Sequence, residues 1–231
     1  MQVNLKSITP NAELNIVEIA RVSSARTDKT EKPEGLINYL IKNKHWSPFQ
    51  HSYLTFEITT SKAIGIQLLR HLSFTFQEFS QRYAKVENIE SIEFRLQAEK
   101  NRQSSTIPIG NIIQQENGFV VKNENLSEFD IDINKAKEID NWLLRIADHL
   151  EIGLELYKEG LDLGIAKECA RMILPMATET KIYMTGSIRS WIHFLEIRDD
   201  GHAQKEVQLI AKEIKQQFKL ECPIISNALN W

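Results

Sequence analysis

The sequence from Gln67 to Tyr83 reads Gln-Leu-Leu-Arg-His-Leu-Ser-Phe-Thr-Phe-Gln-Glu-Phe-Ser-Gln-Arg-Tyr, and the rest of the chain must be organised around it. Arg70, Glu78 and Arg82 are interleaved here with three phenylalanines. An ordinary surface helix separates its charged residues from its apolar ones, whereas this stretch mixes them. A buried arginine needs an anion, and its planar guanidinium matches phosphate or carboxylate. We therefore interpret the stretch as one wall of a polar pocket.

The chain has the length and composition of one globular domain. Its 231 residues fall short of the length, roughly 250–300 residues, at which single cores divide, so we expect one domain over residues 1–231. The formal net charge of −3 gives no electrostatic support for binding nucleic acid or a membrane surface. No apolar run approaches the roughly 20 residues of a membrane span.

Cysteine use and the first residues predict a cytoplasmic protein. Cys169 and Cys222 are the only cysteines, and two such widely spaced cysteines fit neither a disulfide framework nor a zinc site. We expect both to be small buried hydrophobic residues in a reducing compartment. Residues 1–10 lack the charged-then-apolar pattern of a signal peptide.

Hydrophobic periodicity and turn residues predict strands and helices interspersed along the chain. We expect strands at residues 1–8, 53–59, 89–96 and 178–184. We expect helices at residues 11–20, 35–43, 61–71, 136–157, 165–171, 187–195 and 203–218. Residues 26–33 and 100–110 are expected to be loops, and 117–118 a turn. Asn11 and either Thr60 or Ser61 are expected helix caps. The pattern favours an α+β fold with one mostly antiparallel sheet flanked by helices.

Five arginines stand among apolar neighbours: Arg70, Arg82, Arg171, Arg189 and Arg198. A single such arginine is expected to cover the edge of the core with its aliphatic stem. Five of them favour an anionic ligand.

The expected helix at residues 187–195 carries a polar face. Arg189, His193 and Glu196 follow one another at i, i+4 and i+7. This face either contributes to a site or is an ordinary exposed face, with Arg198 as a favourable cation at the helix end.

Other site chemistries have little support in the sequence. His45 and His51 match no common zinc spacing, so we expect no metal site. Neither cysteine has an activating base nearby in sequence. The chain contains no glycine-rich phosphate-binding pattern.

The stretch from Gln67 to Tyr83 resembles the flavin-dependent thymidylate synthases, whose signature is Arg-His-Arg followed by seven residues and Ser. Arg70, His71 and Ser80 match this signature, and Leu72 stands where the family usually has Arg. Further blocks resemble the family in the same order along the chain. They are residues 20–23, 45–51, 170–175 and 189–198.

The resemblance implies the fold of that family and its reaction. The chain would methylate dUMP to dTMP reductively, with 5,10-methylenetetrahydrofolate as carbon donor and NADPH-reduced FAD as hydride source. It would assemble as a homotetramer whose active sites are shared between subunits. The catalytic residue would be Arg198, which would stabilise negative charge on the uracil ring.

The resemblance also implies two sets of binding residues. Those for FAD would be Ser23, His45, Ser47, Gln50, Arg70, His71, Leu72, Glu78, Ser187, Arg189 and His193. Those for dUMP would be Gln67, Arg70, Glu78, Ser80, Gln81, Arg82, Arg171 and Arg198.

Two alternatives follow from the same residues. Leu72 lacks the cation and the five donors of the usual arginine, so the chain could be a weakly active or inactive protein that binds FAD and dUMP. A nucleic-acid binder could instead use the arginines with Phe74, Phe76 and Trp191 as stacking platforms. The net charge of −3 argues against this second alternative.

Overall fold

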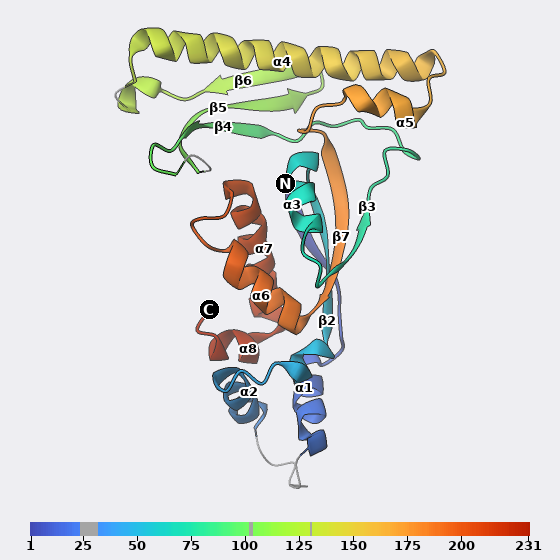
Figure 1. Ribbon diagram of the computed structural model, residues 1–231, viewed down its shortest axis with the longest axis vertical. Coiled ribbons are helices and arrows are strands. Elements are labelled where there is room, and N and C mark those ends of the chain that lie inside the picture. Colours follow the sequence, from blue (N-terminus) through green and yellow to red (C-terminus); the bar gives the residue numbers. More distant parts are fainter. Residues whose placement is uncertain (24–31, 102–103, 130) are drawn as a thin grey trace. The chain divides into compact units, whose positions relative to one another are not determined.

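A computed structural model of the protein describes residues 1–23, 32–101, 104–129 and 131–231 (Figure 1). The chain divides into two compact units. The four-stranded unit comprises residues 2–59, 66–78 and 181–231, and the meander unit comprises Met1, residues 60–65 and residues 79–180.

The four-stranded unit is built on a sheet with the order β1-β2-β7-β3. Its strands are β1 (Gln2–Ile8), β2 (Tyr53–Ser61), β7 (Glu179–Ser187) and β3 (Thr75–Glu78). The pairs β1–β2 and β3–β7 are antiparallel. Along β2, Leu54, Phe56 and Ile58 are fully buried and alternate with more exposed residues. This two-residue period gives the sheet one apolar face.

Helices supply the rest of this unit. They are α1 (Ala12–Ala20), α2 (Pro33–Lys42), the second half of α3 (Lys62–Leu69) from residue 66, α6 (Ile188–Arg198), α7 (Lys205–Glu221) and α8 (Pro223–Ala228), with the short 3-10 helices η1 (Arg21–Ser23) and η2 (Ser47–Gln50). Helix α7 packs against α6, α8 and strand β1. Its Gln217 amide accepts from the backbone N–H of Leu5 and donates to the carbonyl of Val3, each at 2.8 Å. The side chain thus completes hydrogen bonds of an edge strand.

The core of the four-stranded unit is aromatic around Trp191. The Trp191 ring meets Phe74 and Phe56 edge to face, with centroids 4.6 and 4.9 Å apart. Its indole N–H donates to the carbonyl of Leu54 at 3.1 Å. Phe74 also lies directly over Gly186 of β7, where a Cβ would overlap the phenyl ring. Glycine is therefore required at this close approach.

The meander unit pairs one long helix with a three-stranded antiparallel sheet. Its elements are β4 (Ile92–Gln97), β5 (Ser105–Gln115), β6 (Gly118–Asn123), η3 (Leu126–Phe129), α4 (Ile133–Asp162), α5 (Lys167–Ala170) and η4 (Arg171–Ile173). The carboxylate of Asp132 caps α4 by accepting from the backbone N–H groups of Asn134 and Lys135. Ile112 of β5 packs with Leu143 and Leu150 of α4 in the core of this unit.

The expected α+β class with antiparallel pairing is confirmed, but the strands form two sheets instead of one. The loop expected at residues 100–110 is wrong from Ser105 onward, because β5 begins there. Pro108 lies in that strand where its register against β4 shifts, and irregularities of this kind are the positions where strands accept proline. The turn expected at 117–118 is confirmed: Gln115 pairs with Gly118, whose φ of 118° suits glycine.

The helix expected at 61–71 ends at Leu69, so Arg70 and His71 follow it instead of lying on it. Ser61 does cap α3, accepting from the backbone N–H of Ile64 at 3.4 Å. Asn11 is not a side-chain cap of α1, because it adopts the left-handed conformation with a φ of 51°.

Strands β3 and β6 and helix α8 were also not expected from the sequence. The buried carboxylate of Glu13 accepts a hydrogen bond from the backbone N–H of Ile225, in the first turn of α8, at 2.7 Å. The loop expected at 26–33 lies mostly outside the described residues. Within the described ranges, no helix combines the length and the apolar character needed to cross a membrane.

Substituting Gly186→Ala is expected to lower the free energy of unfolding by about 1–3 kcal/mol, because the new methyl group would displace the Phe74 ring from a packed core. Urea unfolding followed by tryptophan fluorescence measures this loss. The matched control is Gly35→Ala in α2, where a Cβ would meet nothing within 4 Å. It should leave stability unchanged or slightly raised. Equal effects of the two substitutions would refute the close packing at Gly186.

Candidate flavin and nucleotide site

The junction of β7 and α6 places a polar helix face beside a cavity. Ser187 ends β7 and caps α6, its hydroxyl accepting from the backbone N–H of Ser190 at 3.2 Å. Because residues three and four apart lie on the same side of a helix, Arg189, His193 and Glu196 share one side of α6. All three are exposed and line the cavity. The polar face expected from the sequence is confirmed.

The cavity has a volume of about 560 Å³, within the range of roughly 300–1,000 Å³ that is usual for small-molecule sites. Its walls combine aromatic rings, neutral hydrogen-bonding groups and both signs of charge. They are formed by Trp46, Gln50, Tyr53, Ser73, Ser187, Arg189, Ser190, Ile192, His193 and Glu196. A ligand with aromatic, hydroxylated and anionic parts fits such a lining.

At the C-terminal end of α6, Arg198 is bonded to His71. The Nε–H of Arg198 donates to Nε2 of His71 at 3.0 Å, and both side chains are partly buried. Burial lowers the pKa of His71 to about 4, and the positive charges of Arg198, His193 and Arg70 act in the same direction. His71 is therefore neutral at pH 7.

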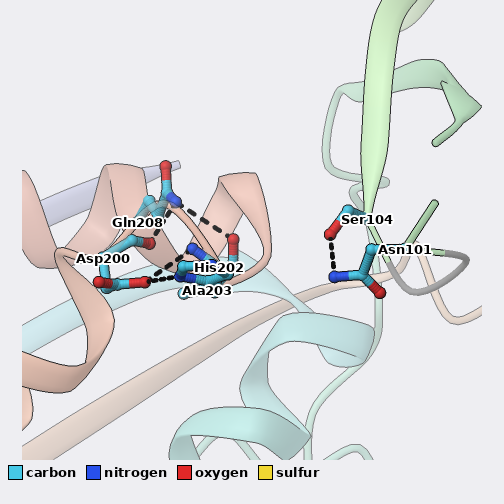
Figure 2. Close-up of polar contacts among 6 residues, drawn as sticks. All are labelled: Asn101, Ser104, Asp200, His202, Ala203 and Gln208. Carbon is cyan, nitrogen blue, oxygen red and sulfur yellow. Dashed lines mark hydrogen bonds and ion pairs between the residues drawn. The ribbon is translucent and has the colours of Figure 1, made fainter.

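The turn after Arg198 is tied to α7 (Figure 2). The amide of Gln208 donates to the carbonyls of Asp200 and Ala203, and the carboxylate of Asp200 accepts from the backbone N–H of His202 at 2.8 Å. The hydrogen bond from the His202 backbone N–H, together with that of the His202 ring, lowers the pKa of the Asp200 carboxyl. In the meander unit, the same figure shows the Asn101 amide donating to the Ser104 hydroxyl at 2.8 Å.

An ion pair holds Asp199, the residue that follows Arg198. The carboxylate of Asp199 pairs with Lys215 Nζ at 2.8 Å, and that ammonium lies 4.8 Å from the centre of the Trp231 ring. Both charged side chains are about three-quarters or more buried, with exposed fractions of 18% and 25%. A shielded ion pair holds the end of α6 more firmly than an exposed one would.

The residues expected to bind FAD all belong to the four-stranded unit. Gln50, Ser187, Arg189 and His193 line the cavity. The others do not line it: His45, Ser47, Arg70 and Leu72 are exposed, Glu78 ends β3, and His71 bonds Arg198. Ser23 ends η1, and its side chain lies outside the described part.

The residues expected to bind dUMP are divided between the units. Gln67, Arg70, Glu78 and Arg198 belong to the four-stranded unit, and Ser80, Gln81, Arg82 and Arg171 to the meander unit. The Gln67 amide donates to Gln204 at 2.5 Å. Arg82 pairs with Glu168 at 3.3 Å, with more than half of each side chain exposed. The gathering of all eight around dUMP stays a prediction, because the residues are divided between the two units.

Several cavity residues were not among the predicted site residues. Trp46 lies within the 45–51 block that resembles the family, and Tyr53 begins the following strand. Glu196 was placed on the polar face of the helix but not in a site. Ser190 lies within the 189–198 block that resembles the family, whereas Ser73 carries no signal in the sequence. Folding brings the two together, and the Ser190 hydroxyl donates to the Ser73 carbonyl at 3.2 Å.

The two cysteines differ in burial. Cys222 is fully buried, as expected, and burial raises the pKa of its thiol. Cys169 is exposed, so its expected burial is wrong. Within the described ranges, no three His, Cys, Asp or Glu side chains are grouped so as to hold a metal ion.

Known proteins with the same pattern identify the class. A family model described as thymidylate synthase complementing protein matches residues 4–224. The chain is 40% identical over 225 residues to a probable flavin-dependent thymidylate synthase of Paramecium bursaria Chlorella virus 1, covering 95% of this chain and 91% of the viral protein. It is 40% identical over 217 residues to the flavin-dependent thymidylate synthase of Synechocystis sp., covering 94% and 88% of the two chains.

A solved structure has the same fold. The UMP/dUMP methylase PolB from Streptomyces cacaoi, bound with 5-Br UMP, superposes with a TM-score of 0.74 at 25% sequence identity. The superposition covers 99% of this chain and 93% of that one. The chain belongs to the family of flavin-dependent thymidylate synthases, so the resemblance carried by Arg70, His71 and Ser80 is confirmed.

Proposed function

We propose that this protein is a flavin-dependent thymidylate synthase. It converts dUMP to dTMP, takes the carbon from 5,10-methylenetetrahydrofolate and uses FAD reduced by NADPH. Family membership over residues 4–224 carries this proposal. The cavity beside α6 supports it independently, because four residues assigned to FAD by the resemblance line one space of suitable size.

The chemistry of the lining fits FAD. Arg189 offers a cation and paired donors to a pyrophosphate, for which a guanidinium is well suited. Trp46 and Tyr53 offer aromatic surface to a ring system. Gln50 and His193 offer hydrogen bonds. The bound flavin supplies the hydride, and the protein supplies orientation and a defined electrostatic environment.

The arginines fit a pyrimidine monophosphate. In this proposal Arg70, Arg82 and Arg171 bind the phosphate, where several guanidinium groups offset its double negative charge. Arg198 faces the uracil ring and stabilises negative charge on it. A guanidinium suits this role because it stays protonated while the base ionises. The remaining residues of this site are Gln67, Glu78, Ser80 and Gln81, which supply hydrogen bonds and orient the arginines.

The proposed enzyme is a homotetramer in the cytoplasm, with each active site shared between subunits. Family membership over residues 4–224 supports this assembly, because the resemblance to the family implies it. Sedimentation analysis of the protein with and without FAD tests the assembly.

The direct test is formation of dTMP by the purified protein supplied with FAD, NADPH, dUMP and 5,10-methylenetetrahydrofolate. We expect product only when all four are present. Replacing Arg198→Met should reduce kcat by about 100- to 1,000-fold, as for loss of a charge-stabilising donor. His149→Phe on the exposed surface of α4 should leave kcat unchanged. Bound flavin without any dTMP would contradict the proposal and favour an inactive FAD and dUMP binder.

The departure at Leu72 gives a second test. Its side chain is 94% exposed, so it contributes little packing within the chain. Leu72→Arg restores a cation where the family usually has one, and we expect it to tighten FAD binding several-fold. Fluorescence titration of FAD measures the affinity, with Leu72→Met as the uncharged control. An unchanged affinity would exclude this position from flavin binding.

A further inference from the structure

We infer that His71 is a positioning residue for Arg198, and that it acts by accepting a hydrogen bond from the guanidinium. This inference rests on the proposed function, because it assigns Arg198 to the uracil ring. It adds a role for His71 that is separate from any contact with the flavin. The 3.0 Å bond between Arg198 Nε and His71 Nε2 carries it.

The bond uses one of the five donors of the guanidinium, the one on Nε. An arginine has five N–H donors, one on Nε and four on the two Nη nitrogens. His71 takes the single donor nearest the aliphatic stem and so restricts rotation of the planar group. The two Nη nitrogens form an edge of the planar group whose donors can pair side by side with two acceptors of one ligand. Fixing Nε therefore sets the direction of that edge.

The imidazole is itself held in place by aromatic rings. Its centroid lies 4.9 Å from the Phe194 ring, which it meets edge to face, and 6.3 Å from the Phe74 ring. Phe194 is fully buried on α6, and Phe74 packs on Gly186 and Trp191. A positioning group must be rigid to orient another. The aromatic contacts supply that rigidity.

The interaction requires a neutral imidazole. Since the Arg198 Nε–H can only donate, His71 Nε2 must present its lone pair, which puts the ring proton on Nδ1. The charged groups facing His71 are Arg198 and His193 on α6 and Arg70 on its own segment. Together with burial they lower its pKa to about 4. Protonation would remove the acceptor and place two cations in contact.

The decisive experiment is a double-mutant cycle measured on the FAD-saturated enzyme. His71→Phe keeps an aromatic ring but removes the acceptor, and we expect kcat for dTMP to fall about 10- to 100-fold, as for misplacement of a reacting group. In the Arg198→Met background the same change should cost nothing further. His71→Gln, which offers a carbonyl acceptor, should recover part of the loss. His149→Phe is the matched control and should be silent in both backgrounds.

The outcomes separate this inference from the proposed function. A wild-type protein that forms no dTMP would refute the proposed function, and the inference with it. Normal dTMP formation with equal losses from His71→Phe in both backgrounds would refute the inference alone. The same holds if the loss disappears entirely once FAD is saturating, because His71 would then serve only flavin binding.

A second readout does not depend on activity. Folded His71 has a pKa of about 4, whereas the unfolded chain holds histidine near 6.5, so the unfolded chain binds more protons between these values. Stability should therefore fall as the pH drops from 6.5 toward 4. Urea unfolding at pH 7 and pH 5 should show a smaller loss for His71→Phe than for wild type. An identical loss would contradict a neutral, buried acceptor.

Discussion

The close approach of the Phe74 ring to Gly186 is the constraint on which the site depends. It fixes the segment after α3 against the junction of β7 and α6, because a side chain at residue 186 would occupy the same space. The ring also packs on Trp191 at 4.6 Å. His71, three residues before Phe74, is thereby brought to Arg198. One apolar contact thus sets the geometry of a polar pair.

Helix α6 connects the residues proposed to bind the flavin with the arginine proposed to face the uracil ring. Its first turn, capped by Ser187, carries Arg189 on the wall of the cavity. Its last residue is Arg198, whose orientation is set by His71 and by the Asp199–Lys215 ion pair of the following residue. A rigid helix holds distant groups at fixed separation. In the proposed function it therefore fixes the flavin residues relative to the residue that faces uracil.

Much of this arrangement could be predicted from local sequence. The period of three and four residues in 187–198 predicted the polar face of α6, and the signature around Arg70 predicted the family. The elements and site residues that the sequence did not predict depend on contacts between residues distant in sequence. Strand β3 exists because Thr75 to Glu78 pair with β7. The cap of α8 comes from Glu13, 212 residues earlier in the chain. No local pattern encodes such partners, and the same is true of Ser73 in the cavity.

The central claim is that the cavity beside α6 holds the flavin. A crystal structure of the protein grown with FAD tests it most directly. We expect electron density for FAD along Trp46, Gln50 and Arg189, with the His71–Arg198 hydrogen bond retained. Density for FAD elsewhere on the protein, with these cavity residues untouched by it, would refute a flavin site in this cavity.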